Sequence, residues 1–433
     1  MAKEYLEKNV YESALERIEY LFNEFDNVLI AFSGGKDSSV CLNLCYDYAK
    51  EHGMLDKLAM YHLDYEAQYQ MTTDYVDETF KQFSDIKRYW LCLPLSAQCC
   101  CNMTSGTWIP WEEEKKELWV REMPQYDYII NEHNVQFKFD KADMDYKAQT
   151  NFGRWFSKQY GKTAVVIGIR ADESLHRYCA VSNDDKKIMY KDKKWCSIVN
   201  KETINVYPIY DWTAEDVWIY NAKFQKSYNK LYDLYYQAGL GINQMRVASP
   251  FNDCASNTLK LYKVIDPNNW GKMVNRVNGV NFTGLYGGTT AMGWKSITLP
   301  KGHTWKSYLN FLLNTLDEKT REHYVKIFSV SMEYWLEKGG NVDKDQYEEL
   351  LKKNEVQITS VGQSTRYADK YTVTFGEYPD DLDISDFSKV PSYKRMCICI
   401  LKNDYFCKYM GFGQTKEDYE KRRRAIERYK NIM

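Results

Sequence analysis

The stretch VLIAFSGGKDSS, residues 28–39, decides the fold of this chain. Residues 28–32 form a continuous apolar run between Asp26-Asn27 and a glycine turn, a pattern that predicts a strand buried on both faces of a parallel sheet. Residues 38–50 then have the pattern of a helix, and Gly53 follows where a helix places its left-handed residue. Strand, glycine turn and helix therefore come directly after one another.

The glycine turn, residues 33–38, has the features of a phosphate-binding loop. Gly34 and Gly35 carry no side chain that would keep backbone N–H groups away from an anion, and the following helix directs its positive end to the same point. Lys36 adds a full positive charge, and Asp37 is the type of residue that holds Mg²⁺. The loop also supplies the hydroxyl groups of Ser33, Ser38 and Ser39. It is shorter than a Walker A loop, and we expect it to hold a pyrophosphate group.

Strand and helix patterns alternate through the first half of the chain. Further strands are predicted at residues 58–63 and 163–168, and amphipathic helices at residues 10–25 and 72–83. This alternation predicts a Rossmann-like, doubly wound α/β fold with a mainly parallel sheet. Ligands of such sheets lie at the carboxyl ends of the strands, where Ser33, Asp64 and Gly168 fall. We therefore expect these positions to converge on one site.

The length of the chain, 433 residues, exceeds that of a usual single domain, so two domains are expected. Residues 1–245 are predicted to form a nucleotide-binding domain with a long polar and aromatic insertion at about 92–150. Beyond that boundary the alternation fades, and residues 246–433 are predicted to form a mostly helical domain. Its helices are expected at residues 304–316, 320–338 and 416–429.

Composition narrows the function classes. With 44% hydrophobic and 27% charged residues, the chain has the balance of a folded globular protein. No apolar stretch is long enough to span a membrane, and the start lacks the apolar run of a signal peptide, so we expect a cytoplasmic protein. A net charge of −2 provides no global attraction to nucleic acid. The basic stretch 421–430 leaves a local nucleic-acid contact open, although a solvated, salt-bridged helix is the simpler interpretation.

The 12 cysteines are too sparse for a disulfide scaffold and are expected to be reduced thiols. Cys99, Cys100 and Cys101 are adjacent, which invites a metal interpretation. An iron-sulfur cluster is not expected, because no Cys-x-x-Cys occurs and adjacent cysteines cannot all face one ion.

The motif SGGKDS at residues 33–38 resembles the signature of the PP-loop ATP pyrophosphatase superfamily. Three further features resemble phosphoadenylylsulfate (PAPS) reductases: Asp64 with Thr72, Gly168-Ile169-Arg170 with Ser174 and Arg177, and the tract 207–218. The chain departs from the reductase pattern after Asp64, where Tyr65-Glu66 stands in place of Thr-Gly.

Over its whole length the chain is similar to PAPS-reductase-like proteins related to immunoglobulin-binding regulator A. The segments that carry this similarity are 244–247, 272–279, 299–305 and 403–407. The resemblance implies a Rossmann-like PP-loop domain, a bound adenine nucleotide and a ParB-like protein partner. It implies no single reaction.

The resemblance also implies a set of site residues. Nucleotide contacts are expected from Ser33, Gly34, Gly35, Lys36, Asp37, Ser38, Ser39, Asp64, Thr72 and Gly168. Arg170 and Arg177 are expected to contact phosphate, sulfate or carboxylate, with Glu173 and Ser174 between them. Arg246 is expected to reach the same cleft from the C-terminal side. The alternative for these arginines is an ordinary solvated surface.

These features favour an ATP-dependent enzyme that adenylates an acceptor and releases pyrophosphate. An acceptor of unknown identity would bind near Arg170 and Arg177 and attack the α-phosphate, while Lys36 and Mg²⁺ held by Asp37 stabilise the departing pyrophosphate. A PAPS-binding oxidoreductase is the first alternative, but the chain lacks the Glu-Cys-Gly-x-His tail of such reductases. A nucleotide-sensing regulatory subunit with a ParB-like partner is the second.

Overall fold

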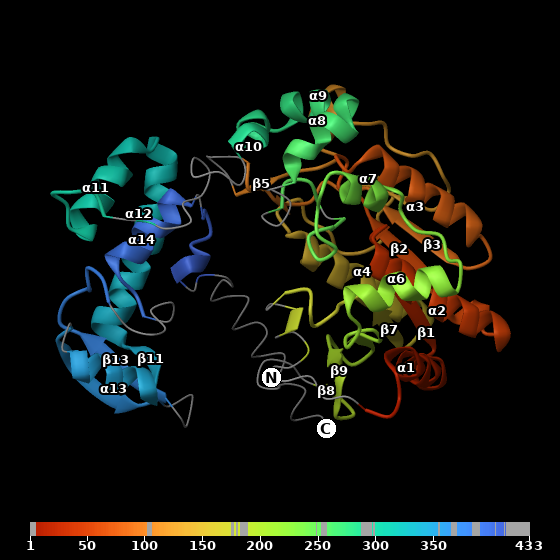
Figure 1. The fold of residues 1–433 in the computed structure, drawn as a ribbon, viewed down its shortest axis with the longest axis horizontal. Helices are drawn as coiled ribbons and strands as arrows, with labels where there is room; N and C mark the ends of the chain where they lie inside the picture. The colour runs from red at the N-terminus through yellow and green to blue at the C-terminus, as the bar shows by residue number, and fades with distance from the viewer. Residues whose placement is uncertain are drawn as a thin grey trace. The chain divides into compact units, whose positions relative to one another are not determined.

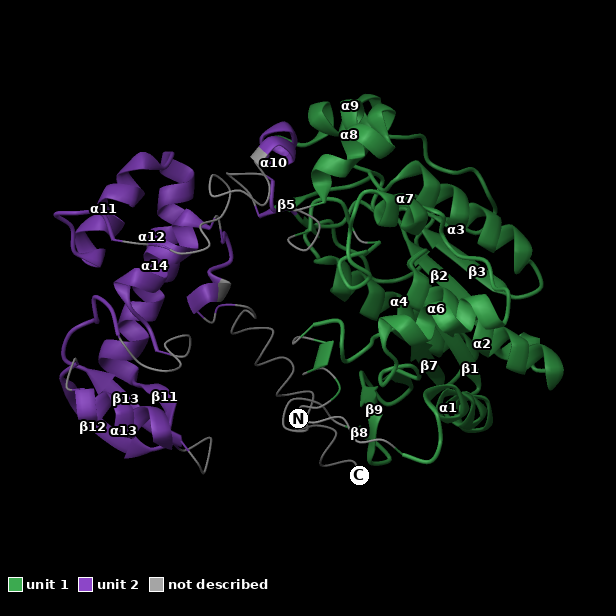
Figure 2. Cartoon of the chain, in the orientation of Figure 1, with its two compact units in different colours: residues 1–98, 107–278 green, residues 99–106, 279–433 purple. Residues whose placement is uncertain are grey.

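The computed structural model divides into two compact units, drawn in different colours in Figure 2. Unit 1 comprises residues 1–98 and 107–278, and unit 2 comprises residues 99–106 and 279–433. The structure describes residues 6–101, 106–174, 177–178, 181, 189–247, 249–252, 258–286, 297, 299–353, 356–364, 370–382, 390–402, 404–410 and 412. The predicted helix at 416–429 and the basic stretch 421–430 lie outside the described residues.

Unit 1 is built around an 8-stranded sheet in the order β6-β3-β2-β1-β7-β10-β9-β8 (Figure 1). Its strands are β1 (Asn27–Ala31), β2 (Leu58–Leu63), β3 (Lys87–Leu91), β6 (Ile129–Ile130), β7 (Thr163–Val166), β8 (Met189–Tyr190), β9 (Lys193–Ile198) and β10 (Thr203–Val206). All pairs from β6 through β10 are parallel, and β9 and β8 form an antiparallel edge. The predicted Rossmann-like fold with a mainly parallel sheet is confirmed.

Nearly every side chain of β1, β2 and β7 is buried. Because successive side chains of a strand point to opposite faces, both faces of the central sheet are covered. The helices of unit 1 include α1 (Val10–Glu24), α2 (Lys36–Glu51), α3 (Gln70–Gln82), α4 (Asp145–Tyr160), α6 (Ala214–Lys223), α7 (Leu231–Gln237), α8 (Tyr262–Ile265) and α9 (Pro267–Arg276). Val28 and Ile30 of β1 share a core with α1, α2 and α3. The opposite face receives Phe152 of α4, whose ring centroid lies 5.0 Å from that of Tyr61 on β2.

The predicted elements of unit 1 are confirmed with small shifts at their ends. α2 begins at Lys36, earlier than predicted, because Gly35 is an extended N-cap with φ −93° and ψ 162°. Gly53 has φ +67° and so takes the predicted left-handed conformation after this helix. Among the described residues, no helix combines the length and apolar character needed to cross a membrane.

The predicted insertion at 92–150 has its own short elements. They are β4 (Ala97–Gln98), β5 (Thr107–Trp108), the 3-10 helix η2 (Glu113–Leu118), β6 and the first turns of α4. β4 and β5 pair with each other, whereas β6 pairs with β3 and so extends the main sheet. Part of the insertion therefore completes the fold of unit 1.

The predicted domain boundary near residue 245 falls inside unit 1. α8 and α9 pack on the segment that follows β2. Tyr262 of α8 stacks on Tyr69 with ring centroids 3.5 Å apart, and Asn269 of α9 donates from Nδ2 to the Gln68 carbonyl at 3.2 Å. These contacts extend the compact unit to residue 278.

Unit 2 contains helices and a small sheet. The helices include α10 (Val280–Tyr286), α11 (Trp305–Thr315), α12 (Glu318–Glu333), α13 (Lys344–Lys353) and α14 (Tyr393–Leu401). α11 and α12 match two predicted helices. The antiparallel sheet β11-β13-β12 consists of β11 (Gly340–Asp343), β13 (Lys370–Phe375) and β12 (Ile358–Gln363). The sequence did not predict this sheet, because β12 is mostly exposed and has no clear apolar alternation.

Candidate functional site

The predicted phosphate loop lies between β1 and α2, at the carboxyl end of β1. Gly34 has φ +75°, and a Cβ added there would lie 2.9 Å from Cγ2 of Val76. Glycine alone meets this conformation and this space without strain. Gly35 caps α2, so the first N–H groups of the helix are directed toward the loop.

The serine hydroxyls of the loop mainly hold its shape. The Oγ atoms of Ser33 and Ser38 are 3.0 Å apart, and Ser38 and Ser39 donate to the Gly35 carbonyl at 3.0 and 2.9 Å. Tyr75 of α3 donates to Ser39 Oγ at 3.0 Å. Ser38 and Ser39 are buried, whereas Ser33 is exposed. Of the three predicted hydroxyl donors, Ser33 is therefore the accessible one.

Asn229 and the helix α7 cover the loop. Tyr232 of α7 accepts a hydrogen bond from the Lys36 N–H at 3.1 Å. Asn229 donates from Nδ2 to the Gly34 carbonyl at 3.2 Å and to Thr72 Oγ1 at 3.0 Å. The Tyr232 hydroxyl thus engages one amide of the predicted phosphate loop. Thr72 supports the loop through Asn229.

Lys36, Asp37 and Arg170 form a chain of ion pairs beside the loop. Lys36 Nζ lies 3.1 Å from Asp37 Oδ2, and Arg170 Nε lies 2.5 Å from Asp37 Oδ1. Arg170 also donates from Nη1 to Asp172 Oδ1 at 2.5 Å. Burial acts to lower the pKa of Arg170, but the charges of Asp37 and Asp172 raise it overall. Cations therefore engage both oxygens of Asp37. Its role as a Mg²⁺ ligand stays a prediction.

Glu173 contacts the two other predicted arginines, Arg177 and Arg246. Arg177 Nη1 lies 2.9 Å from Glu173 Oε2, and Arg246 Nη2 donates to the Glu173 carbonyl at 2.6 Å. Ser174 Oγ accepts from the Arg177 N–H at 3.3 Å. The side chains of Arg177 and Arg246 are 40% and 29% exposed, against 1% for Arg170. Arg177 and Arg246 are therefore the accessible cations of this set.

The two remaining predicted contacts, Gly168 and Asp64, behave differently. Gly168 follows β7 and touches the loop, since a Cβ added there would lie 2.9 Å from the carbonyl carbon of Asp37. Asp64 is fully buried, and its carboxylate accepts from Trp90 Nε1 at 2.7 Å and pairs with Arg121. Burial acts to raise the pKa of Asp64, but the charge of Arg121 lowers it overall. Protein groups therefore engage the Asp64 carboxylate, and its contact with a nucleotide stays a prediction.

A buried carboxylate that the sequence interpretation missed lies just beyond Asp64. Glu66 is fully buried with φ +61°, and its carboxylate accepts from the N–H groups of Trp111 at 2.7 Å and Val120 at 3.0 Å. It also pairs with Arg276 of α9, whose Nε lies 2.9 Å from Oε1. The Glu66 carboxylate thus joins the loop after β2 to α9 through an ion pair, and to the insertion through two hydrogen bonds. The sequence held a signal for this role, because Glu66 stands where PAPS reductases carry glycine, and the structure shows that this position is left-handed.

Two family models cover most of the chain. Residues 27–241 match the phosphoadenosine phosphosulfate reductase domain, and residues 239–421 match a domain of unknown function, DUF3440. The chain is also 32% identical over 426 residues to the uncharacterized protein YbdN of Escherichia coli (strain K12), which covers 97% of this chain and 94% of YbdN.

The chain belongs to the YbdN family of proteins with a PAPS reductase domain. The PAPS reductase domain contains the loop, Gly168, Arg170 and Arg177. The DUF3440 region contains Arg246 and Arg276. Unit 1 therefore contains the reductase domain, except for residues 99–106, together with the start of DUF3440. The two models meet at residues 239–241, close to the boundary predicted near 245.

Solved structures resemble about half of the chain at a low level. FMN adenylyltransferase from Candida glabrata matches with 14% identity and a TM-score of 0.30, over 53% of this chain and 62% of that chain, less than two thirds of its length. PAPS reductase from Candida auris, in a phosphate complex, matches with 16% identity and a TM-score of 0.29, over 54% of this chain and 94% of that chain. Similarities at this level do not identify a substrate.

A cavity of about 530 Å³ opens within the insertion of the PAPS reductase domain. It lies beyond the carboxyl ends of β3 and β6, at the same sheet edge as the phosphate loop. Its walls include Trp111 and Trp119, whose rings meet edge to face 5.1 Å apart, and Arg121, which lies 5.0 Å over the Trp111 ring. No local pattern predicts this cavity, because separate segments supply its residues.

The cysteines of the described part of the chain are thiols, and most are buried. The sulfur atoms of Cys100 and Cys101 are 4.0 Å apart. Within the described ranges, one group of three or more side chains has the spacing of a metal site, and it contains no cysteine: Glu113, Glu132 and His133.

Proposed function

We propose that the PAPS reductase domain binds ATP at the loop 33–38 and adenylates an acceptor, with release of pyrophosphate. The observation that carries this proposal is the left-handed Gly34, with φ +75°, followed by Gly35 as the N-cap of α2 and by the buried Lys36. This arrangement directs backbone N–H groups and a full positive charge to one point, which suits a polyanion. A simple strand-to-helix turn has no need of a buried lysine, since lysine is rarely buried.

ATP binding would exchange contacts that the loop already makes. The Tyr232 hydroxyl accepts from the Lys36 N–H, and the Asp37 carboxylate holds Lys36 Nζ. A phosphate oxygen accepts stronger, charge-assisted hydrogen bonds than a hydroxyl does. ATP entry therefore displaces the Tyr232 side chain and turns the Lys36 ammonium from Asp37 to the phosphates.

In the proposed reaction an acceptor attacks the α-phosphorus of ATP. A bond forms between the acceptor and phosphorus, the bond from phosphorus to the bridging oxygen breaks, and pyrophosphate leaves with the electron pair while the acceptor proton passes to solvent. Lys36 and the loop amides stabilise the charge on pyrophosphate. Arg170 holds the loop through Asp37, and the accessible Arg177 and Arg246 favour an anionic acceptor.

The family match over residues 27–241 favours a second candidate function, the binding of PAPS by an oxidoreductase. A sulfonucleotide would present phosphate and sulfate to the same loop and arginines. Reduction also needs a reactive thiolate. Burial raises the pKa of Cys41 and Cys45, the thiols of α2, above the usual range, so neither supplies that thiolate.

Product analysis distinguishes these functions. The full chain is incubated with ATP, Mg²⁺ and a panel of anionic acceptors, and separately with PAPS and a dithiol. We expect AMP transfer and pyrophosphate release that Lys36→Met abolishes and that the control Lys50→Met, at the exposed end of α2, retains. Sulfite release from PAPS would support the oxidoreductase instead. Tight ATP binding without any product would support a regulatory subunit with a ParB-like partner.

A further inference from the structure

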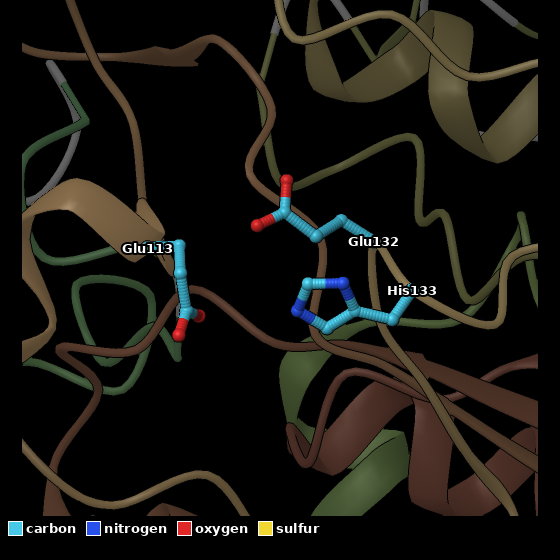
Figure 3. Close-up of side chains that lie close together, drawn as sticks. All are labelled: Glu113, Glu132 and His133. Carbon is cyan, nitrogen blue, oxygen red and sulfur yellow. The ribbon is translucent and has the colours of Figure 1, made fainter.

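Three potential metal ligands converge in the insertion, away from the phosphate loop. Glu113 lies on η2, and Glu132 and His133 directly follow β6. One ligand atom from each of the three lies within 4.8 Å of the other two. Figure 3 shows the Glu132 carboxylate and the His133 ring extending toward Glu113 across a common gap. The three side chains also line the 530 Å³ cavity described above.

Lysines engage one oxygen of each carboxylate. Lys116 Nζ lies 3.2 Å from Glu113 Oε1, and Lys141 Nζ lies 2.9 Å from Glu132 Oε2. These ion pairs orient the carboxylates, and each carboxylate has a second oxygen that can bind an ion. They also reduce the negative charge of the group, so we expect weaker binding than at a closed structural zinc site.

We infer that Glu113, Glu132 and His133 form a binding site for a divalent transition-metal ion such as Zn²⁺. One imidazole nitrogen with two carboxylate oxygens is a ligand set that zinc accepts, and water completes a fourth, open position. Zinc needs ligand atoms at about 2.0–2.2 Å, so the side chains must close in by rotation. The exposed His133 is free of the packing that would prevent this rotation.

The site would have a mechanical and a chemical consequence. Because Glu113 comes from η2 and the other ligands from the segment after β6, a bound ion would cross-link two parts of the insertion. Its open position would face a cavity lined by Trp119 and Arg121, where an anionic group can replace the water. This inference is independent of ATP binding, since it involves none of the loop residues.

Metal content tests the inference directly. The full chain is dialysed against Zn²⁺ and the bound metal is counted for the wild type, His133→Ala and Glu113→Gln. The matched control is Glu114→Gln, the neighbouring carboxylate, whose side chain is 72% exposed and outside the group. We expect the two site variants to lose one equivalent that the control retains. Equal metal content in all four proteins would overturn the inference.

Cobalt identifies the ligands and separates this site from the cysteines. Co²⁺ bound by nitrogen and oxygen gives weak visible bands, whereas thiolate ligation adds an intense charge-transfer band in the near ultraviolet. We expect the His133-dependent equivalent to lack that band, and Lys116→Met to tighten its binding several-fold by removing a competing cation. A thiolate band on this equivalent, or unchanged affinity in Lys116→Met, would contradict the assignment.

Discussion

The phosphate loop and the insertion lie at the same edge of one sheet, yet they are built in opposite ways. In the loop, neighbouring residues from Ser33 to Ser39 supply nearly all the chemistry, and tertiary contacts such as Tyr232 only cover it. The insertion is instead held by a buried ion pair from outside it, between Glu66 after β2 and Arg276 of α9, and the Glu66 carboxylate also accepts from the N–H groups of Trp111 and Val120. Local chemistry can therefore be recognised from sequence, whereas a buried charge network depends on pairing that only the fold creates.

The largest effect is expected from breaking the network of the insertion. Arg276→Met leaves the Glu66 carboxylate buried without its cation, which costs about 3–5 kcal/mol. Chemical denaturation followed by tryptophan fluorescence measures this loss. Lys272→Met is the control, because Lys272 is exposed on the same helix. A loss no larger than that of the control would show that the ion pair does not hold the insertion.

The next effect is expected in the loop itself. Gly34→Ala introduces a Cβ into a left-handed position, at about 1–2 kcal/mol, and places it 2.9 Å from Val76, at about 1–3 kcal/mol more. Gly53→Ala is the control, because Gly53 is also left-handed but has open space around it. Thermal unfolding should therefore show a larger loss for Gly34→Ala. Equal losses would mean that the loop tolerates the extra atom.

A smaller effect is expected from the residue that covers the loop. Tyr232→Phe removes the hydroxyl that occupies the Lys36 N–H, a hydrogen bond worth about 0.5–1.5 kcal/mol. ATP no longer has to displace it, so titration calorimetry should show tighter binding in this variant than in Tyr236→Phe, whose side chain is exposed. Weaker binding would mean that Tyr232 contacts the nucleotide.

The last effect is confined to acid pH and concerns Glu24, which belongs to neither region. Hydrogen bonds from Lys191, Tyr190 and Lys162 lower the pKa of Glu24 from 4.5 to about 2. Because the folded-state pKa is depressed, this cluster stabilises the fold above pH 4.5, and the contribution is lost as the pH falls toward 2. Glu24→Gln should therefore flatten the dependence of stability on pH in that window. A dependence as steep as that of the wild type would contradict this assignment.

Several features of the fold and site were predictable because short segments of the sequence determine them. The buried run 28–32, the glycines that follow and the left-handed Gly53 all reflect local backbone requirements. The role of Asp64 was not predictable in this way, because Trp90 and Arg121 reach its carboxylate from the next strand and from the insertion. The ion pair between Asp37 and Arg170 was not predictable either, because only the fold brings these two distant residues together.

Titration calorimetry of ATP binding tests the central claim, that the loop 33–38 holds a polyanionic nucleotide, most directly. The wild type should bind one ATP per chain. Lys36→Met should weaken binding by about 1.5–3 kcal/mol, roughly 10- to 100-fold, because it removes a charged hydrogen-bond donor, while Lys50→Met leaves binding unchanged. Absence of ATP binding by the wild type, or equal affinity in Lys36→Met, would contradict the account.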